Sequence, residues 1–241
     1  MMSADSNSWQ ETWMDALLDA QTETDIFRIM CTAARELGFD HCAYGLRTAL
    51  PLSNPKTHLL NNYSSSWQQR YAEQNYLVVD PTVAHAMSSI APLVWNDQVF
   101  MNCGAFWEDA RAHGLNVGWA QASYDSKGNA GLLTLARSHD SLTPAELRDH
   151  GYKMAWLAQA SHARLSCLIL ASQAADTQAS LTTREIEILR WTADGKTSGE
   201  VSQILQISER TVNFHVQNSM DKLGVSNKTA AVIKAAMLRL L

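Results

Sequence analysis

Aromatic side chains that also form hydrogen bonds recur in the first half of this 241-residue chain. Tyr63, Trp67 and Tyr71 lie four residues apart, so a helix through them places the three rings on one face. Asp80 and Trp95 follow soon after. Such side chains can bind a small ligand, because indole and phenol groups donate hydrogen bonds and a carboxylate accepts them. The alternative is a core stripe whose polar tips reach solvent, and the composition alone favours that alternative.

No short catalytic motif in the chain has the neighbours that its chemistry requires. Residues 195–197, Gly-Lys-Thr, resemble the end of a phosphate-binding loop, but Arg190 stands where its first glycine is needed. Residues 53–56 match S-x-x-K, but Pro55 interrupts the helix on which that motif acts. The eight histidines are scattered, and neither G-x-S-x-G nor H-E-x-x-H occurs. We therefore expect no enzymatic activity, no catalytic residue, no metal and no cofactor.

The composition is that of a globular protein, with 46% hydrophobic and 18% charged residues. The first residues lack the basic and apolar segments of a secretory signal, and no run approaches the roughly 18 apolar residues of a membrane helix. No C-x-x-C pair occurs, so neither a zinc knuckle nor a disulfide framework is expected from Cys31, Cys42, Cys103 and Cys167. We expect a cytoplasmic protein that binds no membrane.

Tryptophan and charge are distributed unevenly, which predicts two domains. Seven of the eight Trp residues precede Asp176. From Asp176 onward eight Lys/Arg face seven Asp/Glu, whereas the preceding part has 11 against 17 and is acidic. Residues 172–180 are small and polar without an apolar period, as is typical of a linker. We predict an N-terminal domain over residues 1–171, a linker over 172–180 and a C-terminal domain over 181–241.

The C-terminal domain contains clear signals for four short helices. Thr182 with Glu185, and Thr197 with Glu200, each have the spacing of a capping box at a helix start. Ser208 is suited to cap the third helix after a turn of two to three residues, which makes a helix-turn-helix arrangement. Further boundaries are expected at Gly195, Gly224 and Asn227.

The third of these helices has a buried stripe and a polar face. Its predicted stripe is Val212, Val216, Met220 and Leu223. Long amides and a guanidinium on the opposite face can read base edges in the major groove, whereas residues at helix ends suit phosphates. For any single residue, a solvated polar face is an equally good interpretation. The predicted DNA-contacting set is Lys196, Thr197, Arg210, Thr211, Asn213, His215, Gln217, Asn218 and Lys222.

The C-terminal motifs resemble those of one family of DNA-binding domains. The segments LTTREIEIL, WTADGKT, ISERTVNFHV and DKLGV, which begin at residues 181, 191, 207 and 221, are similar to the output domain of LuxR-type regulators. The resemblance covers the whole tail and implies a helix-turn-helix protein that binds DNA. Two-component response regulators use the same output domain, so the N-terminal domain must identify the input signal.

The N-terminal domain has a mixed pattern of helices and strands. Its sequence predicts a fold of the α+β class, an α/β/α sandwich around an antiparallel sheet. A phosphorylated receiver domain would need alternating strand–helix units, which are not seen. Helices are predicted at 24–37, 65–75, 80–89 and from Thr143 to Leu170, and strands at 39–46, 58–62, 118–124 and 131–137, the last two forming a hairpin.

The aromatic motif of this domain strengthens the family assignment. Tyr63-x3-Trp67-x3-Tyr71, Asp80-Pro81, Trp95 and Gly114-Leu-x-x-Gly118 look like the autoinducer-binding domain of LuxR-type quorum-sensing receptors. The resemblance implies an N-acyl-homoserine lactone ligand. It suggests Trp67 as donor to the lactone carbonyl, Asp80 as acceptor from the amide N–H, and Tyr63 or Thr134 as donor to the amide carbonyl. Trp95, Phe106 and Trp107 would form an aromatic wall, and Tyr71, Ala43, Gly45 and Val79 would border the acyl chain.

The same resemblance suggests how binding leads to regulation. Lactone binding completes the N-terminal core, and the long helix from Thr143 then supports a homodimer. The dimer binds a palindromic promoter element and acts with RNA polymerase, most simply as an activator. The alternatives are an orphan relative with another ligand or none, a repressor released by ligand, and a regulator switched by phosphorylation. Candidate dimer contacts are Trp156, Leu157, Ala160 and Leu165.

Overall fold

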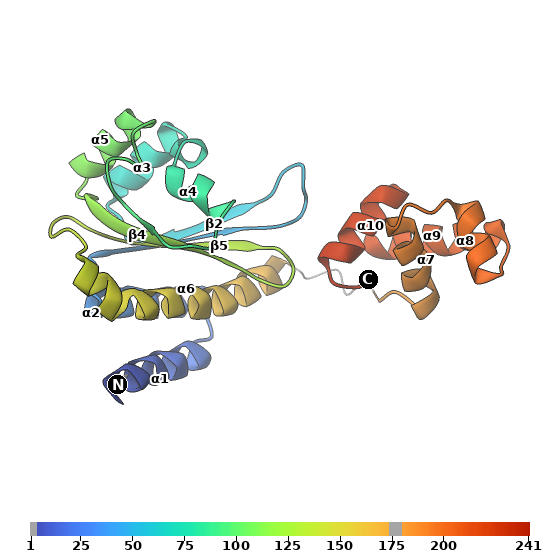
Figure 1. Cartoon of the computed structure of the whole chain (residues 1–241), viewed down its shortest axis with the longest axis horizontal. Coiled ribbons are helices and arrows are strands. Elements are labelled where there is room, and N and C mark those ends of the chain that lie inside the picture. The colour runs from blue at the N-terminus through green and yellow to red at the C-terminus, as the bar shows by residue number, and fades with distance from the viewer. Residues whose placement is uncertain (1–3, 174–179) are drawn as a thin grey trace. The chain divides into compact units, whose positions relative to one another are not determined.

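The computed structural model describes residues 4–173 and 180–241, which form two compact units. The N-terminal unit contains a sheet and the helices up to α6, and the C-terminal unit contains α7 to α10 (Figure 1). Residues 174–179, most of the predicted linker, lie outside the described residues. Within the described ranges no helix has both the length and the apolar content needed to cross a lipid bilayer.

A five-stranded antiparallel sheet forms the middle layer of the N-terminal unit, with strand order β2-β1-β5-β4-β3. The hairpin of β4 and β5 was predicted, and the structure confirms it. The short edge strand β3 was not predicted, because two residues are too few to show a period. The strands are β1 (His41–Arg47), β2 (Thr57–Asn61), β3 (Leu93–Val94), β4 (Val117–Tyr124) and β5 (Ala130–Arg137).

Helices cover both faces of this sheet, so the predicted α/β/α sandwich is confirmed (Figure 1). One face packs against α2 (Glu23–Glu36) and the long α6 (Pro144–Gln173), with α1 (Ala4–Asp19) outside them. The other face lies under α3 (Ser65–Glu73), the 3-10 helix η1 (Tyr76–Val78), α4 (Pro81–Ala86) and α5 (Gly104–Ala112). Helices α1 and α5 were not predicted.

The main hydrophobic core lies between the sheet and the layer of α2 and α6. Two of the predicted dimer contacts, Leu157 and Leu165, belong to this core and are completely buried. Their assignment to a dimer surface is therefore wrong, because this face of α6 packs against the chain's own sheet. Trp156 and Ala160 are only partly buried, and the Trp156 ring lies 5.7 Å from that of Trp9.

The C-terminal unit has the four predicted helices, α7 (Thr183–Ala193), α8 (Ser198–Leu205), α9 (Glu209–Leu223) and α10 (Lys228–Met237). Both capping boxes are present, because the Thr182 and Thr197 side chains accept from the backbone three residues on and the glutamates bond back. The Ser208 side chain accepts from Thr211 N and begins α9. Gly224 ends α9 with φ +62°, where a residue without Cβ is least strained.

Candidate functional site

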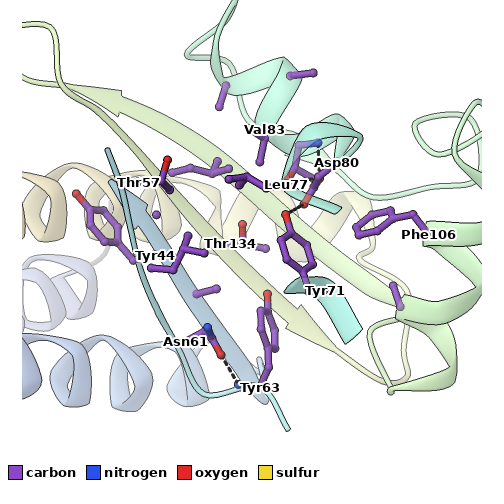
Figure 2. A pocket seen from close by; sticks show the side chains of 18 of the residues that line it. Tyr44, Thr57, Asn61, Tyr63, Tyr71, Leu77, Asp80, Val83, Phe106 and Thr134 are labelled. Carbon is purple, nitrogen blue, oxygen red and sulfur yellow. Dashed lines mark hydrogen bonds between the residues drawn. The ribbon is translucent and has the colours of Figure 1, made fainter. Parts of the chain in front are cut away.

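A pocket of about 840 Å³ lies within the N-terminal unit, between the sheet and the layer of α3, η1, α4 and α5 (Figure 2). Strand β1 contributes Ala43, Gly45 and Arg47, which alternate along the strand and therefore face the same side. Strand β5 contributes Thr134, which pairs with Ala43. The sheet is thus the floor of the pocket and the short helices are its walls.

The aromatic residues of the pocket wall pack against one another. The Trp67 ring lies 5.9 Å from both the Tyr76 and the Phe106 rings, and 5.2 Å from that of His113. Phe100 stacks on Trp107, with ring centroids 4.2 Å apart. These contacts form a second hydrophobic cluster, separate from the main core across the sheet. The aromatic stripe thus has both of the roles considered from the sequence, core packing and pocket lining.

A polar contact outside this cluster fixes α5 against α3. Asp109 of α5 accepts hydrogen bonds from Arg70 Nε, at 2.6 Å, and from the Tyr76 hydroxyl. Trp67 belongs to α3 and its ring packs against Tyr76 and against Phe106 of α5, so this contact holds the neighbours of the ring in place. Sequence reasoning missed Asp109 and Tyr76, because the two partners are 33 residues apart and belong to no local pattern.

Asp80 is a buried carboxylate at the start of α4, with Pro81 in the first helical turn. Its Oδ1 accepts from Thr82 N at 2.8 Å and from Thr82 Oγ1 at 2.7 Å, and its Oδ2 accepts from the Tyr71 hydroxyl at 3.0 Å (Figure 2). Burial raises the pKa of Asp80, and the Thr82 and Tyr71 hydrogen bonds oppose this shift. Oδ2, with a single protein donor, has room for an N–H from a ligand.

Three further hydroxyl groups belong to the polar part of the pocket. Tyr63, Tyr71 and Thr134 line it, and Figure 2 shows their oxygen atoms on its inner side. Burial raises the pKa of both Tyr63 and Tyr71, and nearby Asp80 adds to the effect. Both phenols are therefore protonated; Tyr71 donates its proton to Asp80, and Tyr63 can donate to a ligand. Thr134 is buried on the central strand β5 and can donate to a carbonyl that reaches the pocket floor.

Trp95 closes one side of the pocket against Gly118. A Cβ at position 118 would overlap the Trp95 indole, which explains the glycine in the predicted Gly114–Gly118 motif. Trp95 Nε1 is buried and has no hydrogen-bond partner among the described residues. The Trp107 indole, in contrast, donates to Asp97 at 2.8 Å. Trp95 therefore holds an unused donor, whereas Trp107 contributes only its ring surface.

The structure places all but one of the sequence-predicted pocket residues in the pocket lining. Val79 is the exception, because it follows η1 with half of its surface exposed, and Leu77 and Val83 line the pocket instead. The assignment of Val79 is therefore wrong. The predicted residues that line the pocket are Ala43, Gly45, Tyr63, Trp67, Tyr71, Asp80, Trp95, Phe106, Trp107 and Thr134.

A second candidate site is the solvent face of α9 in the C-terminal unit. Arg210, Asn213 and Gln217 are exposed on it, opposite the buried Val212, Val216, Ser219 and Leu223. Thr211, His215 and Asn218 are half-buried at its edges, and Lys196 and Thr197 lie just before α8. Sequence reasoning missed Phe214, whose exposed fraction of 60% is unusual for an aromatic residue. The sequence did contain a signal for this exposure, because Phe214 comes two residues after the buried Val212 and therefore lies off the buried stripe of the helix.

Several polar residues of this unit already have partners within it. Asn213 Oδ1 accepts from Ser198 at 2.7 Å, and Gln217 Nε2 donates to Asp221 at 2.9 Å. Lys222 Nζ donates to both carboxylate oxygens of the buried Glu185, at 2.8 and 3.0 Å. The Lys222 ammonium therefore joins α9 to α7, and its contact with phosphate stays a prediction.

The ion pair also determines the charge state of Glu185. Burial by itself raises the pKa of this carboxyl, but the Lys222 ammonium and the Thr182 hydrogen bonds outweigh it, so the pKa is lowered. Glu185 therefore stays ionised.

No group of three or more His, Cys, Asp or Glu side chains that could hold a metal ion occurs in the described part of either unit.

Both units match known protein families. Residues 22–165 match the autoinducer binding domain, and residues 179–235 match the bacterial regulatory proteins of the luxR family. The chain is 49% identical to the transcriptional activator protein AnoR of Acinetobacter nosocomialis over 236 residues, which cover 97% of this chain and 99% of that protein.

Solved structures show the same arrangement of elements. The crystal structure of Escherichia coli SdiA superposes with a TM-score of 0.84 at 33% identity, covering 98% of this chain and 99% of that one. SdiA in complex with octanoyl-rac-glycerol gives a TM-score of 0.82 at 32% identity, covering 98% of this chain and 97% of that one. CepR2 of Burkholderia cenocepacia, described as N-acylhomoserine lactone dependent, gives a TM-score of 0.64 at 35% identity, covering 69% of this chain and 98% of that one.

Proposed function

Because this chain belongs to the LuxR family of bacterial transcription regulators, which are not enzymes, we propose that it is a quorum-sensing receptor for an N-acyl-homoserine lactone. The observation that carries the proposal is the pocket itself. Asp80, three protonated hydroxyls and an aromatic wall surround about 840 Å³ of space on one side of the sheet. A ligand with two carbonyl acceptors, one N–H donor and an apolar chain satisfies these groups.

The assignment of ligand contacts follows from donor and acceptor chemistry. Asp80 accepts from the amide N–H, because an ionised carboxylate has no proton to donate. Trp67 donates its indole N–H to the lactone carbonyl, and Tyr63 or Thr134 donates to the amide carbonyl. Trp95 packs on the lactone ring. Each of these buried polar groups, if left unmatched, would cost about 1–3 kcal/mol.

Ligand binding acts on the rest of the protein through the stability of the N-terminal unit. A ligand enclosed in the pocket binds only the folded state and adds about 2.7 kcal/mol at 100 times its Kd. The stabilised unit forms a homodimer, for which Trp156 and Ala160 remain candidate contacts. Two C-terminal units then bind the half-sites of a palindromic element in the cytoplasm. The protein acts with RNA polymerase as an activator of transcription; the activating role is supported by the name of AnoR, a transcriptional activator protein.

A thermal melt with a panel of short- and medium-chain lactones tests the ligand. We expect the N-terminal transition to shift upward with at least one of them. The variant Trp67→Phe keeps a ring and removes the donor. It should therefore need about ten times more ligand than the unmodified chain to reach the same shift in melting temperature. Trp9→Phe is the matched control, since Trp9 donates to Glu36 outside the pocket. No shift with any lactone would point to an orphan receptor with another ligand.

DNA contacts are tested by binding assays at several salt concentrations. Gln217→Ala should relax base preference, whereas Lys196→Ala should weaken binding to all sequences and lower the salt dependence. Phe214→Ala should lose affinity mainly at sites with a thymine methyl, the base group that an exposed phenyl ring contacts. Equal effects of these changes on specific and random DNA would reject the assignment. Stronger DNA binding without ligand would identify a repressor.

A further inference from the structure

The pocket has one charged side chain at each end. Among the described residues that line it, Asp80 and Arg47 are the two that carry a charge. Asp80 is the N-cap of α4, and Met87, at the other end of this helix, contacts Arg47 with Nη1 3.4 Å from Sδ. Seven residues of helical rise separate Asp80 from Met87, or about 10 Å. The positive end is therefore one helix length away from the carboxylate.

The strand on the pocket floor gives the same separation. Ala43 pairs with Thr134 at the polar end, and Arg47 pairs with Ala130 four residues further along β1, or about 13 Å. Arg47 also lies opposite Thr57 of β2, so that both side chains face the pocket side. Figure 2 places Thr57 at the side of the pocket away from Asp80 and Phe106.

Arg47 has no acidic partner within the described parts of the chain. Its side chain contacts the Met87 thioether, and Leu59, two residues along β2 from Thr57, is an exposed apolar residue of the pocket lining. The Thr57 hydroxyl forms no hydrogen bond there either. An arginine stem can simply cover apolar surface. That role leaves five N–H donors of a guanidinium beside the mouth of an apolar pocket.

We propose that the Arg47 end is a subsite for a carboxylate at the far end of the ligand's acyl chain. This inference rests on the proposed function and specifies the class of ligand further. A guanidinium binds a carboxylate through two parallel N–H···O bonds, and Thr57 can donate a third. The ligand then matches the pocket at both ends, with its amide N–H at Asp80 and its terminal carboxylate at Arg47.

The length of the pocket sets the length of that chain. An extended hydrocarbon advances about 1.3 Å per carbon, because its bonds of about 1.5 Å zigzag at roughly tetrahedral angles. A separation of about 10–13 Å therefore corresponds to about eight to ten carbons. The apolar stretch between the two charges is lined by Gly45, Leu77 and Val83, which offer no partner for a polar group placed midway.

Two ligands and three variants test the subsite. N-decanoyl-homoserine lactone and its analogue with a terminal carboxylate are titrated into the full-length protein by calorimetry. The measured quantity is the ratio of their Kd values in the unmodified chain, in Arg47→Met, in Arg47→Lys and in Lys56→Met. Lys56 precedes Thr57 but does not line the pocket, so its replacement controls for long-range charge.

We expect Arg47→Met to weaken binding of the carboxylated ligand about fivefold or more relative to binding of the plain lactone. Arg47→Lys should give an intermediate ratio, because it keeps the charge without the fork, and Lys56→Met should leave the ratio unchanged. An unchanged ratio in Arg47→Met would overturn the subsite even if the plain lactone binds, and the proposed function would then stand. Failure of both ligands to bind the unmodified chain would overturn the proposed function and the subsite together.

Discussion

The two units of this protein are built by different kinds of signal. In the C-terminal unit, Thr182, Thr197 and Ser208 each begin a helix by bonding to a backbone N–H three residues on. In the N-terminal unit, the pocket depends on pairs such as Ala43 with Thr134 and Arg70 with Asp109, which are distant in the sequence. Short segments of sequence are therefore enough to predict a helix-turn-helix. They do not predict a pocket, because its residues come together only when the sheet has formed.

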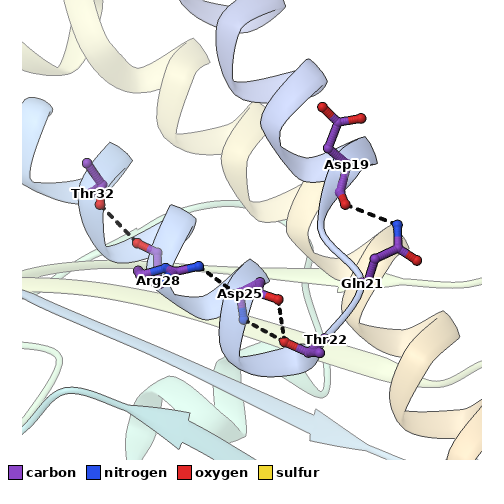
Figure 3. Close-up of polar contacts among 6 residues, drawn as sticks. All are labelled: Asp19, Gln21, Thr22, Asp25, Arg28 and Thr32. Carbon is purple, nitrogen blue, oxygen red and sulfur yellow. Dashed lines mark hydrogen bonds and ion pairs between the residues drawn. The ribbon is translucent and has the colours of Figure 1, made fainter.

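Local signals are not absent from the N-terminal unit. At the junction of α1 and α2, Thr22 caps α2 by accepting from Asp25 N at 3.1 Å, and Asp25 pairs with Arg28 at 2.6 Å (Figure 3). Gln21 donates to the Asp19 carbonyl and fixes the turn between the helices. These contacts lie on the far side of the sheet from the pocket. They position the supporting layer and leave the ligand site to tertiary contacts.

The largest effect is expected from breaking the ion pair of Lys222 with the buried Glu185, a long-range polar contact of the C-terminal unit. Lys222→Ala leaves the Glu185 carboxylate buried without its cation, and should destabilise this unit by about 3 kcal/mol, near the low end for such pairs because Lys222 is partly exposed. Hydrogen exchange, followed separately for the two units, measures the change. Lys228→Ala, at a lysine with no ion pair in the described structure, is the control. Equal protection in both variants would contradict this role for the pair.

A second change tests tertiary packing in the N-terminal unit. A Cβ on Gly131 would overlap the ring of His162 and approach the Tyr44 hydroxyl, so Gly131→Ala should destabilise this unit by about 1–3 kcal/mol. Gly104→Ala is the matched control, since a Cβ there meets no atom within 4 Å. Chemical denaturation measures both variants. A Gly131 variant as stable as the Gly104 variant would show that α6 shifts freely over the sheet.

Removing one helix cap in each unit sharpens the comparison. Ser208→Ala and Thr22→Ala each remove an acceptor for one backbone N–H and should each cost about 1 kcal/mol. Because caps act locally, each change should affect only its own unit and leave lactone affinity unaltered. Thermal melts and calorimetry check both expectations. A change in ligand affinity in the Thr22 variant would show that α2 is coupled to the pocket across the sheet.

The smallest expected effect is a difference in pH dependence. Burial lowers the pKa of His162, so its stabilising contribution is complete above its unfolded value of about 6.5 and is lost as the pH falls below it. The lowered pKa of Glu185 stabilises the C-terminal unit above about 4.3 and is lost only at lower pH. Stability measured between pH 7 and 5.5 should therefore fall by up to about 1 kcal/mol in the N-terminal unit alone.

The control for this prediction is His162→Gln, which cannot titrate in that range. Its stability should vary less with pH than that of the unmodified chain, whose His162 Nδ1 lies 2.8 Å from the Tyr44 hydroxyl. Identical pH profiles for the two proteins would show that another group is responsible. A parallel loss of stability in the C-terminal unit between pH 7 and 5.5 would contradict the expectation that the two units lose stability in different pH ranges.

Sequence reasoning predicted more of the C-terminal unit than of the pocket walls. It located every helix of α7 to α10, because each has its own cap. It missed α5, whose N-cap Cys103 makes no capping hydrogen bond with its side chain, and it assigned Leu157 to a surface that α6 does not expose. It also misplaced Val79, since the 3-10 turn of η1 rotates the chain between Tyr76 and Asp80. The burial of Leu157 depends on neighbours distant in the chain, whereas the errors at α5 and Val79 arise where the local sequence lacks a capping or periodic signal.

The sequence by itself determined the two-domain division, the helix boundaries of the C-terminal unit and the chemical types of ten residues that line the pocket. These follow from local hydrogen bonding, side-chain periodicity and the resemblance to the family. Only the tertiary structure decided that Arg47 and Asp80 lie at opposite ends of one pocket, that Lys222 is held by Glu185, and which face of α6 is buried. The physical reason is that burial and ion pairing depend on distances in space, which spacing along the chain does not fix.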